Sequence, residues 1–171
     1  MRHELKKKVF VDPGSTGRPS WYPEPDQDDD LLFYIQRNQN EDAIVYRVNR
    51  TSGGLISRDL PMDAYWIKFT NGGERRELNA IQSKLAYGYE SEMISPELFR
   101  FRFVAYKSLQ FYIAKKEDQY IAQCEMEGEI VQINNIYVYA LEFGVFPDVK
   151  YIELYGERAD GTFAYRKIDV E

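Results

Sequence analysis

The sequence has almost none of the residues on which nucleophilic enzymes and metal sites depend. Its 171 residues include one cysteine, Cys124, and one histidine, His3. One cysteine excludes an internal disulfide and a cysteine-based zinc site, and a lone histidine near the start of the chain is a poor general base. We therefore predict no metal, no cofactor and no catalytic residue. A hydrolase that uses carboxylates is only the third hypothesis, because no acidic pair stands out by its spacing.

Long apolar runs and an excess of positive charge are also missing. No run approaches the ~18 apolar residues of a membrane span, and the opening MRHELKKKVFVDPG lacks the apolar stretch of a signal peptide. Asp and Glu number 28 against 22 Lys and Arg, so the net charge is −6. Such a chain is poorly suited to nucleic acid or to an anionic membrane. We predict a cytoplasmic protein that neither binds nucleic acid nor inserts into a membrane, and an exported one if a signal peptide has been removed.

Aromatic residues, by contrast, are abundant, with 14 Tyr and 10 Phe. They are typical of half-buried strands. The segments with alternating or β-branched sequence are 31–37, 42–49, 63–70, 99–106, 109–114, 119–126, 129–143, 149–158 and 162–170. Several of them have apolar residues on both faces, so both faces need cover. The sequence predicts a mainly β fold, an antiparallel β-sandwich or flattened barrel of about eight to ten strands.

The segment before these strands has a different composition. Residues 12–30 carry four prolines and end in an acidic run. We interpret residues 1–30 as an extended, solvated arm or linker and residues 31–171 as a single β domain. Trp21 and Tyr22 in this arm are placed either to pack back on the domain or to meet a partner.

One helix is expected to interrupt the strands, over residues 74–87. Glu, Arg, Leu, Ala, Gln and Lys dominate there, and these residues favour helix. Its apolar stripe is formed by Leu78, Ile81 and Leu85. Asn71 with Glu74 resembles a capping box, and Gly88 is placed as a left-handed residue that ends the helix. We expect this helix to cover an open end or face of the sheet.

The edge of this helix is the main candidate for a ligand site. Gln82 and Arg75 border the predicted buried face, where they would line a cleft together with tyrosines of nearby strands. Tyr34 and Gln36 share one face of the strand 31–37, and a polar Gln beside Tyr can mark the wall of such a cleft. Trp66 is either a core residue or part of that wall. The predicted ligand-binding residues are Tyr34, Gln36, Trp66, Arg75 and Gln82.

A second candidate lies at the predicted helix N-terminus. The amides near Gly72 and Gly73 would point outward, and Arg76 adds a guanidinium in the first turn. Helix N-termini attract anions, so these three residues are a candidate site for a phosphate or carboxylate. Simple capping by Glu74 is the alternative.

Four segments in order carry a resemblance to a known family. They are LFYIQRNQNEDAIVYRVN, YWIKF, LNAIQSKLAYG and VKYIELYGERADGTFAYRKI. Over about residues 31 to 168 the chain resembles a family of uncharacterised bacterial domains of unknown function. This resemblance implies no activity, cofactor or site residue.

Two classes of function follow from these patterns. The first is a non-enzymatic binding module that takes an unknown small molecule or protein segment into a tyrosine-rich cleft between helix and sheet. The alternative is a protein-interaction or structural domain without a pocket, which uses an edge strand or the Trp21–Tyr22 arm.

Overall fold

Strands make up most of the described part of the chain, which in the computed structural model covers residues 17–143 and 146–170. Eleven strands in these residues form one sheet in the order β4-β3-β2-β1-β9-β8-β7-β6-β5, and β10 pairs with β9 and β11. The strands are β1 (Leu31–Arg37), β2 (Asn40–Val48), β3 (Met62–Lys68), β4 (Glu74–Glu77), β5 (Tyr89–Ser95), β6 (Leu98–Phe103), β7 (Tyr106–Lys116), β8 (Gln119–Met126), β9 (Glu129–Phe143), β10 (Phe146–Glu157) and β11 (Phe163–Asp169).

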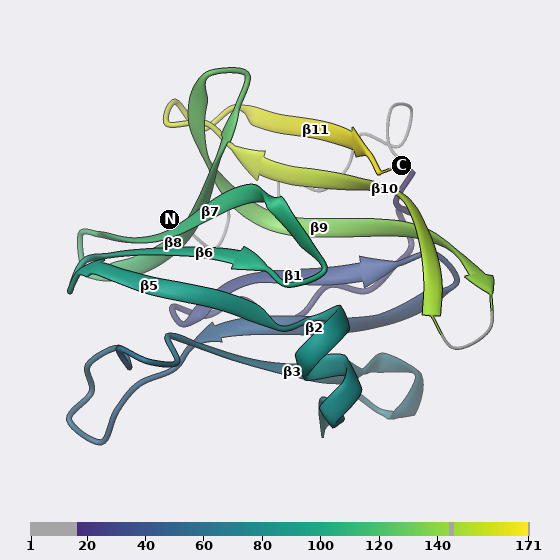
Figure 1. Cartoon of the computed structure of the whole chain (residues 1–171), viewed down its shortest axis with the longest axis horizontal. Helices are drawn as coiled ribbons and strands as arrows, with labels where there is room; N and C mark the ends of the chain where they lie inside the picture. The colour runs from purple at the N-terminus through teal and green to yellow at the C-terminus, as the bar shows by residue number, and fades with distance from the viewer. Residues whose placement is uncertain (1–16, 144–145, 171) are drawn as a thin grey trace.

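The sheet divides at β9, its longest strand. Residues Glu129 to Gln132 pair antiparallel with β8, whereas Asn135 to Val138 pair in parallel with β1. β10 runs antiparallel along the other edge of β9. Because β1 and β8 occupy successive stretches of one edge, the sheet curls into a half-barrel, with β1–β4 on one side and β5–β8 on the other (Figure 1). The predicted mainly β fold is confirmed, with more strands than expected.

Aromatic rings fill the space between the two sides of the half-barrel. Phe33 of β1 stacks on Tyr46 of β2, with ring centroids 4.6 Å apart, and on Phe101 of β6 at 6.1 Å. Phe103 of β6 meets Phe33 and Tyr46 edge-on, at 6.0 and 5.6 Å. All four rings are buried. Stacked and edge-on ring pairs add to the stabilisation that burial provides, so this cluster holds the two sides together.

The segment before β1 lies against the sheet. Tyr22 is 4% exposed, and its hydroxyl donates to the carbonyl of Arg37 at 3.0 Å and accepts from the amide of Asn40 at 3.2 Å. Trp21 beside it is 69% exposed. Arg18, Tyr22 and Pro25 are buried, so this part of the arm packs back on the domain, which was one of the two alternatives expected for Tyr22, while other arm residues are exposed. Residues 1–16 of the predicted arm lie outside the described residues.

Buried polar groups fasten this arm. The amide of Gly17 donates to both carboxylate oxygens of Glu153, at 3.0 and 2.9 Å, and the hydroxyl of Tyr155 donates to the same carboxylate at 2.8 Å. The guanidinium of Arg18, 4% exposed, donates to Gln36 Oε1 at 3.0 and 2.7 Å. Burying these groups is tolerable because each of these bonds replaces one to water.

The helix predicted over residues 74–87 is wrong for its first part, and within that range only residues 80–86 are helical. Its first part is strand β4, which pairs with β3 through the register Lys68↔Glu74 and Tyr65↔Glu77. Gly72 and Gly73, with φ of 70° and 80°, turn the chain between the two strands. The Asn-Gly turn signal and the pairing with β3 therefore outweigh the helix propensity of the Glu and Arg residues.

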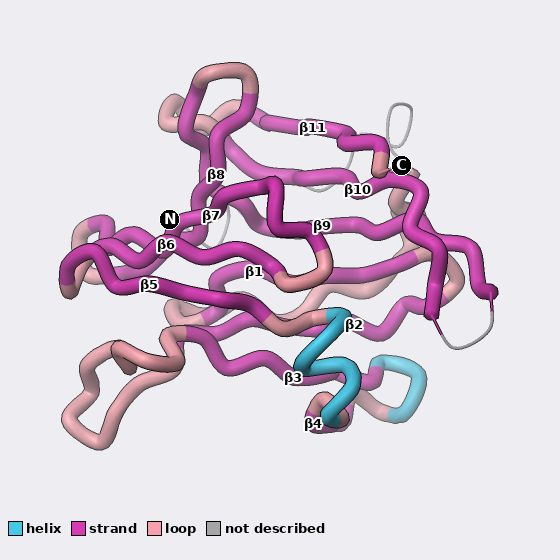
Figure 2. The backbone as a smooth tube through the Cα atoms, viewed as in Figure 1, coloured by secondary structure: helices cyan, strands magenta, loops and turns pink. Residues whose placement is uncertain are grey.

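Only two short helical segments occur in the described residues, η1 (Phe69–Asn71) and the π-type turn η2 (Gln82–Ala86), both cyan in Figure 2. The chain leaves η2 at Gly88, which is not left-handed as predicted. A Cβ on Gly88 would lie 1.9 Å from the carbonyl oxygen of Ser83. Gly88 is therefore required for a close backbone contact, which a helix-ending conformation does not explain. No helix described here is long and apolar enough to cross a lipid bilayer.

Candidate ligand cleft

A cleft of about 740 Å³ opens at one end of the half-barrel, beneath η2. Side chains from the end of β1, from η2, from the β6–β7 turn and from β7, β9 and β10 line it. Its volume lies within the range of ~300–1,000 Å³ that small-molecule sites occupy. The cleft is thus large enough for a small molecule and is built from segments far apart in the sequence.

The lining of this cleft is mostly aliphatic. Its floor includes Ile35 of β1 and Ile136 of β9, which are 5% and 3% exposed, together with Ile152 of β10. Its rim includes Ile81 and Leu85 of the η2 segment, which are 58% and 56% exposed. Large apolar side chains left in solvent beside an apolar hollow are typical of a surface that is covered when a ligand binds.

Hydrogen bonds hold the η2 segment over the cleft. The amide of Gln82 donates to Asn79 Oδ1 at 2.8 Å, and the amide of Asn79 donates to Gln82 Oε1 at 3.0 Å. This reciprocal pair is a capping box, three residues apart as the motif requires. Trp66 Nε1 also donates to Gln82 Oε1, at 3.3 Å, and Tyr46 donates to the carbonyl of Tyr87 at 2.7 Å. The rim is therefore anchored to β2 and β3.

A smaller hollow of about 420 Å³ adjoins the cleft. The turn between β1 and β2, residues 37–40, forms one wall, and residues 139–141 of β9 form the other. Arg37 and Ala140 line both hollows. The larger hollow is lined mostly by apolar side chains, and the smaller one is bordered by the polar turn.

Of the predicted ligand-binding residues, Gln82 lines the cleft. Trp66 does not line it, but donates a hydrogen bond to Gln82. Tyr34 and Gln36 lie on the opposite face of β1, both 0% exposed. Gln36 there donates to the carbonyls of Pro23 and Glu41, at 2.8 and 3.0 Å. These two residues thus lie away from the cleft, and Gln36 is held by the arm.

Arg75 lies on the exposed strand β4, and not beside η2. Its guanidinium contacts Glu77 at 2.5 Å and Asp63 at 3.3 Å, and lies 3.8 Å from the centre of the Tyr65 ring. These interactions keep it on the surface of the β3–β4 hairpin, separate from Gln82.

The candidate anion site was predicted because a helix was expected to begin at Gly72 and Gly73, and the structure has no such helix. Gly72, Gly73 and Arg76 belong to a hairpin, and no helix begins there. The amide of Gly73 donates to the carbonyl of Lys68 at 2.8 Å, and Arg76 pairs with Glu74. Anion binding by these three residues stays an untested prediction, now without the favourable end of a helix dipole.

Two kinds of cleft residue were missed in the sequence. Ile81 and Leu85 were assigned to a buried helix stripe, although they form the exposed rim. Arg37 was not among the predicted site residues, although it lines both hollows.

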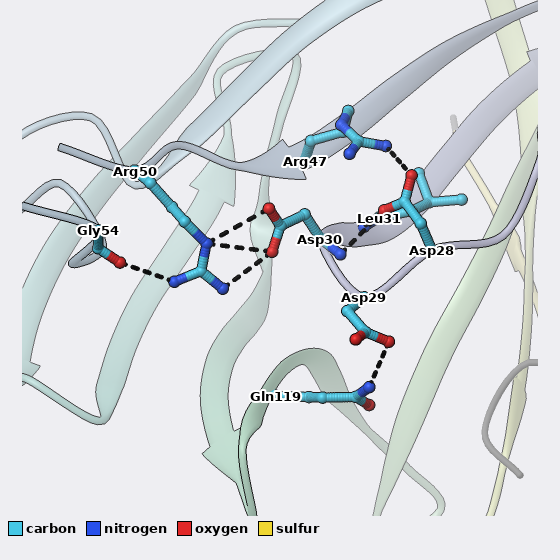
Figure 3. Close-up of polar contacts among 8 residues, drawn as sticks. All are labelled: Asp28, Asp29, Asp30, Leu31, Arg47, Arg50, Gly54 and Gln119. Atoms are coloured by element: carbon cyan, nitrogen blue, oxygen red, sulfur yellow. Dashed lines mark hydrogen bonds and ion pairs between the residues drawn. The ribbon is translucent and has the colours of Figure 1, made fainter. Parts of the chain in front are cut away.

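The acidic run at residues 28–30 has a structural role (Figure 3). Asp28 accepts a hydrogen bond from Arg47 at 2.7 Å, and Asp29 accepts one from Gln119 at 2.5 Å. Asp30 accepts one from Arg50 at 2.8 Å. The run therefore ties the arm to β2, to the first residue of β8 and to the loop after β2. Among residues 17–143 and 146–170, no group of three or more His, Cys, Asp or Glu side chains is placed to hold a metal ion.

Comparison with known proteins assigns the chain to a family. The family model described as Domain of unknown function (DUF4833) matches residues 33–167, so the protein belongs to this family. Neither curated proteins nor solved structures give a match. The family assignment brings no activity with it.

Proposed function

We propose that this protein is a non-enzymatic binding module that takes an apolar small molecule into the cleft beneath η2. The observation that carries the proposal is the cleft of about 740 Å³, with its aliphatic floor and the exposed rim residues Ile81 and Leu85. Binding would remove these side chains from water, which stabilises a complex by about 25 cal/mol for each Å² of apolar surface buried.

The cleft supports binding better than catalysis. Its charged lining residues among those described are Arg37 and Asp148, and the carboxylate of Asp148 lies 2.9 Å from Lys150 Nζ. A carboxylate held in an ion pair at the surface is a poor general base. Cys124 is buried in the core, where desolvation raises the pKa of its thiol to about 12, so it is a poor nucleophile.

Fluorescence titration with the uncharged probe N-phenyl-1-naphthylamine tests the proposal. We expect saturable binding to the native protein and a loss of affinity of about tenfold or more in Leu85→Asp, because a charge at the rim must be desolvated when the probe enters. Leu55→Asp is the matched control, since Leu55 is 73% exposed and does not line the cleft. Both variants should unfold in urea as the native protein does. The proposal fails if the native protein does not bind the probe, or if Leu85→Asp binds it as well as Leu55→Asp.

A further inference from the structure

We propose that the ligand of the cleft is an uncharged apolar molecule with a carbonyl oxygen, and that Gln82 selects it by donating a hydrogen bond to that oxygen. This inference rests on the proposed binding function and names the chemical class of the ligand. It is carried by the side-chain amide of Gln82, which lines the cleft and which is bonded within the described residues through its oxygen alone.

Two donors fix the orientation of this amide. Trp66 Nε1 and the backbone amide of Asn79 donate to Gln82 Oε1, at 3.3 and 3.0 Å. Both are N–H groups that cannot accept, so the atom between them is the oxygen and the other terminal atom is the NH2 group. Asn79 is held in return by the backbone amide of Gln82, at 2.8 Å. The NH2 group is therefore positioned before a ligand arrives, which lowers the entropy that binding costs.

The NH2 group of Gln82 has no hydrogen-bond partner within residues 17–143 and 146–170, and it is open to water. The hydroxyl of Tyr106, which begins β7 and also lines the cleft, is in the same situation. A ligand that fills the cleft removes the water that solvates these donors. Leaving a donor desolvated and unpaired is unfavourable, whereas an acceptor on the ligand replaces the bonds to water. The lining therefore favours a ligand that carries an acceptor.

The charges in the lining favour neither an anion nor a cation. Among the described residues they are Arg37 and Asp148, one of each sign. Both have partners within the protein, and that of Asp148 is Lys150 at 2.9 Å. A charged ligand would have to be desolvated in a mostly aliphatic cleft, and a neutral amide does not compensate for this as an opposite charge would. A carbonyl oxygen accepts hydrogen bonds without carrying a charge, so it fits Gln82.

The test compares three ligands that share a pair of phenyl rings. Benzophenone has a carbonyl between the rings, diphenylmethane has CH2 in its place, and diphenylacetate adds a carboxylate. Equilibrium dialysis against the native protein measures the three affinities. We expect benzophenone to bind about tenfold more tightly than either of the others. Diphenylmethane leaves the NH2 group of Gln82 unpaired, and diphenylacetate brings a charge into the cleft.

Gln82→Glu is the decisive variant. It keeps an oxygen for Trp66 and Asn79 and replaces the NH2 group by a second acceptor, so the rim stays anchored while the donor is lost. The ratio of the affinities for benzophenone and diphenylmethane should fall from about ten in the native protein to about one. This ratio cancels effects of the added charge that are common to both ligands. Gln123→Glu is the matched control, because Gln123 of β8 does not line the cleft, and it should keep the native ratio.

The outcomes separate this inference from the proposed function. If the native protein does not bind N-phenyl-1-naphthylamine, both fail. If it binds that probe without preferring benzophenone, or binds diphenylacetate as tightly, only the carbonyl ligand is overturned, and this comparison decides even if Gln82→Glu does not fold. A ratio that Gln82→Glu leaves unchanged also overturns the inference, and its loss in Tyr106→Phe would assign the selection to Tyr106. A ratio lost in Gln82→Glu and kept in Gln123→Glu supports Gln82 as the selecting residue.

Discussion

Two glycines occupy places where the backbone leaves no room for a side chain. A Cβ on Gly88 would lie 1.9 Å from the Ser83 carbonyl oxygen, and a Cβ on Gly156 would lie 2.0 Å from that of Gln132. In both places the obstacle is backbone, which cannot rotate away as a side-chain end can. Gly88 joins η2 to β5. The position of the cleft rim therefore depends on the absence of a side chain at residue 88.

Replacing Gly88 by Ala should therefore destabilise the protein by about 1–3 kcal/mol, the usual cost of overpacking. The free energy of unfolding in urea at neutral pH measures this cost. Gly53→Ala is the control, since its nearest neighbour would be Thr51 Oγ1 at 3.9 Å, and it should change stability by no more than ~0.5 kcal/mol. Equal stability of the two variants would contradict the close contact at Gly88.

At the scale of elements, the arm is fastened by the side chain of Asp28. Its Oδ1 accepts from the amides of Asp30 and Leu31, at 2.9 and 3.0 Å, and its Oδ2 accepts from Arg47 at 2.7 Å. Burial by itself raises the pKa of Asp28, but these hydrogen bonds outweigh it and hold the pKa below its ordinary value of 3.8. The arm is thus attached most firmly when this carboxylate is charged.

This attachment should weaken in acid. Since the folded-state pKa is the lower one, the carboxylate's contribution to stability is present above the ordinary value of 3.8 and is lost as the pH falls through the folded-state pKa. Asp28→Asn keeps the bonds to the amides and loses the ion pair, so we expect it to cost at most about 1 kcal/mol at neutral pH, because the group is half exposed and screened.

Urea unfolding of native protein and Asp28→Asn across acidic and neutral pH measures this difference, which should shrink towards zero in acid. Asp26→Asn, an exposed substitution in the same arm, should match the native protein throughout. A difference between native and Asp28→Asn protein that does not change with pH would argue against the ion pair as its source.

At the scale of the whole molecule, the two sides of the half-barrel meet through Phe33. This ring is 1% exposed and contacts Tyr46, Phe101 and Phe103. We expect Phe33→Ala to lower the free energy of unfolding by about 3–5 kcal/mol, and Phe33→Leu by less, since it leaves a smaller cavity. Urea titration measures both. If Phe33→Ala does not fold, Phe33→Leu still tests the contact, and a cost below ~0.5 kcal/mol for Phe33→Leu would contradict it.

Some features could be predicted from the sequence because they are local. The segment 31–37 coincides with β1, and Asp160-Gly161 joins β10 to β11, with Gly161 at φ 85°. Strand alternation and turn residues act over a few positions, so neighbours along the chain contain the information. The capping box Asn79–Gln82 was equally local and was overlooked in favour of Asn71–Glu74.

The site could be predicted only in part, for a physical reason. Gln82 lines the cleft, yet the helix on which it was predicted is only partly formed, and Tyr34 and Gln36 lie on the opposite face of β1. Which face of a strand meets the core and which meets the arm depends on contacts between segments more than 100 residues apart, such as Gly17 with Glu153.

The sequence by itself determined the mainly β class, most strand positions and the family. The signals for these features, which are alternating apolar and polar residues, turn residues and the order of short motifs, can be recognised in the sequence without knowledge of tertiary contacts. Only the tertiary structure decided that residues 74–77 pair with β3, that the arm covers β1, and that the end of β1, η2 and β9 enclose one cleft. Backbone pairing between strands and burial of apolar faces act across distant segments, and these forces override local propensity where the two disagree.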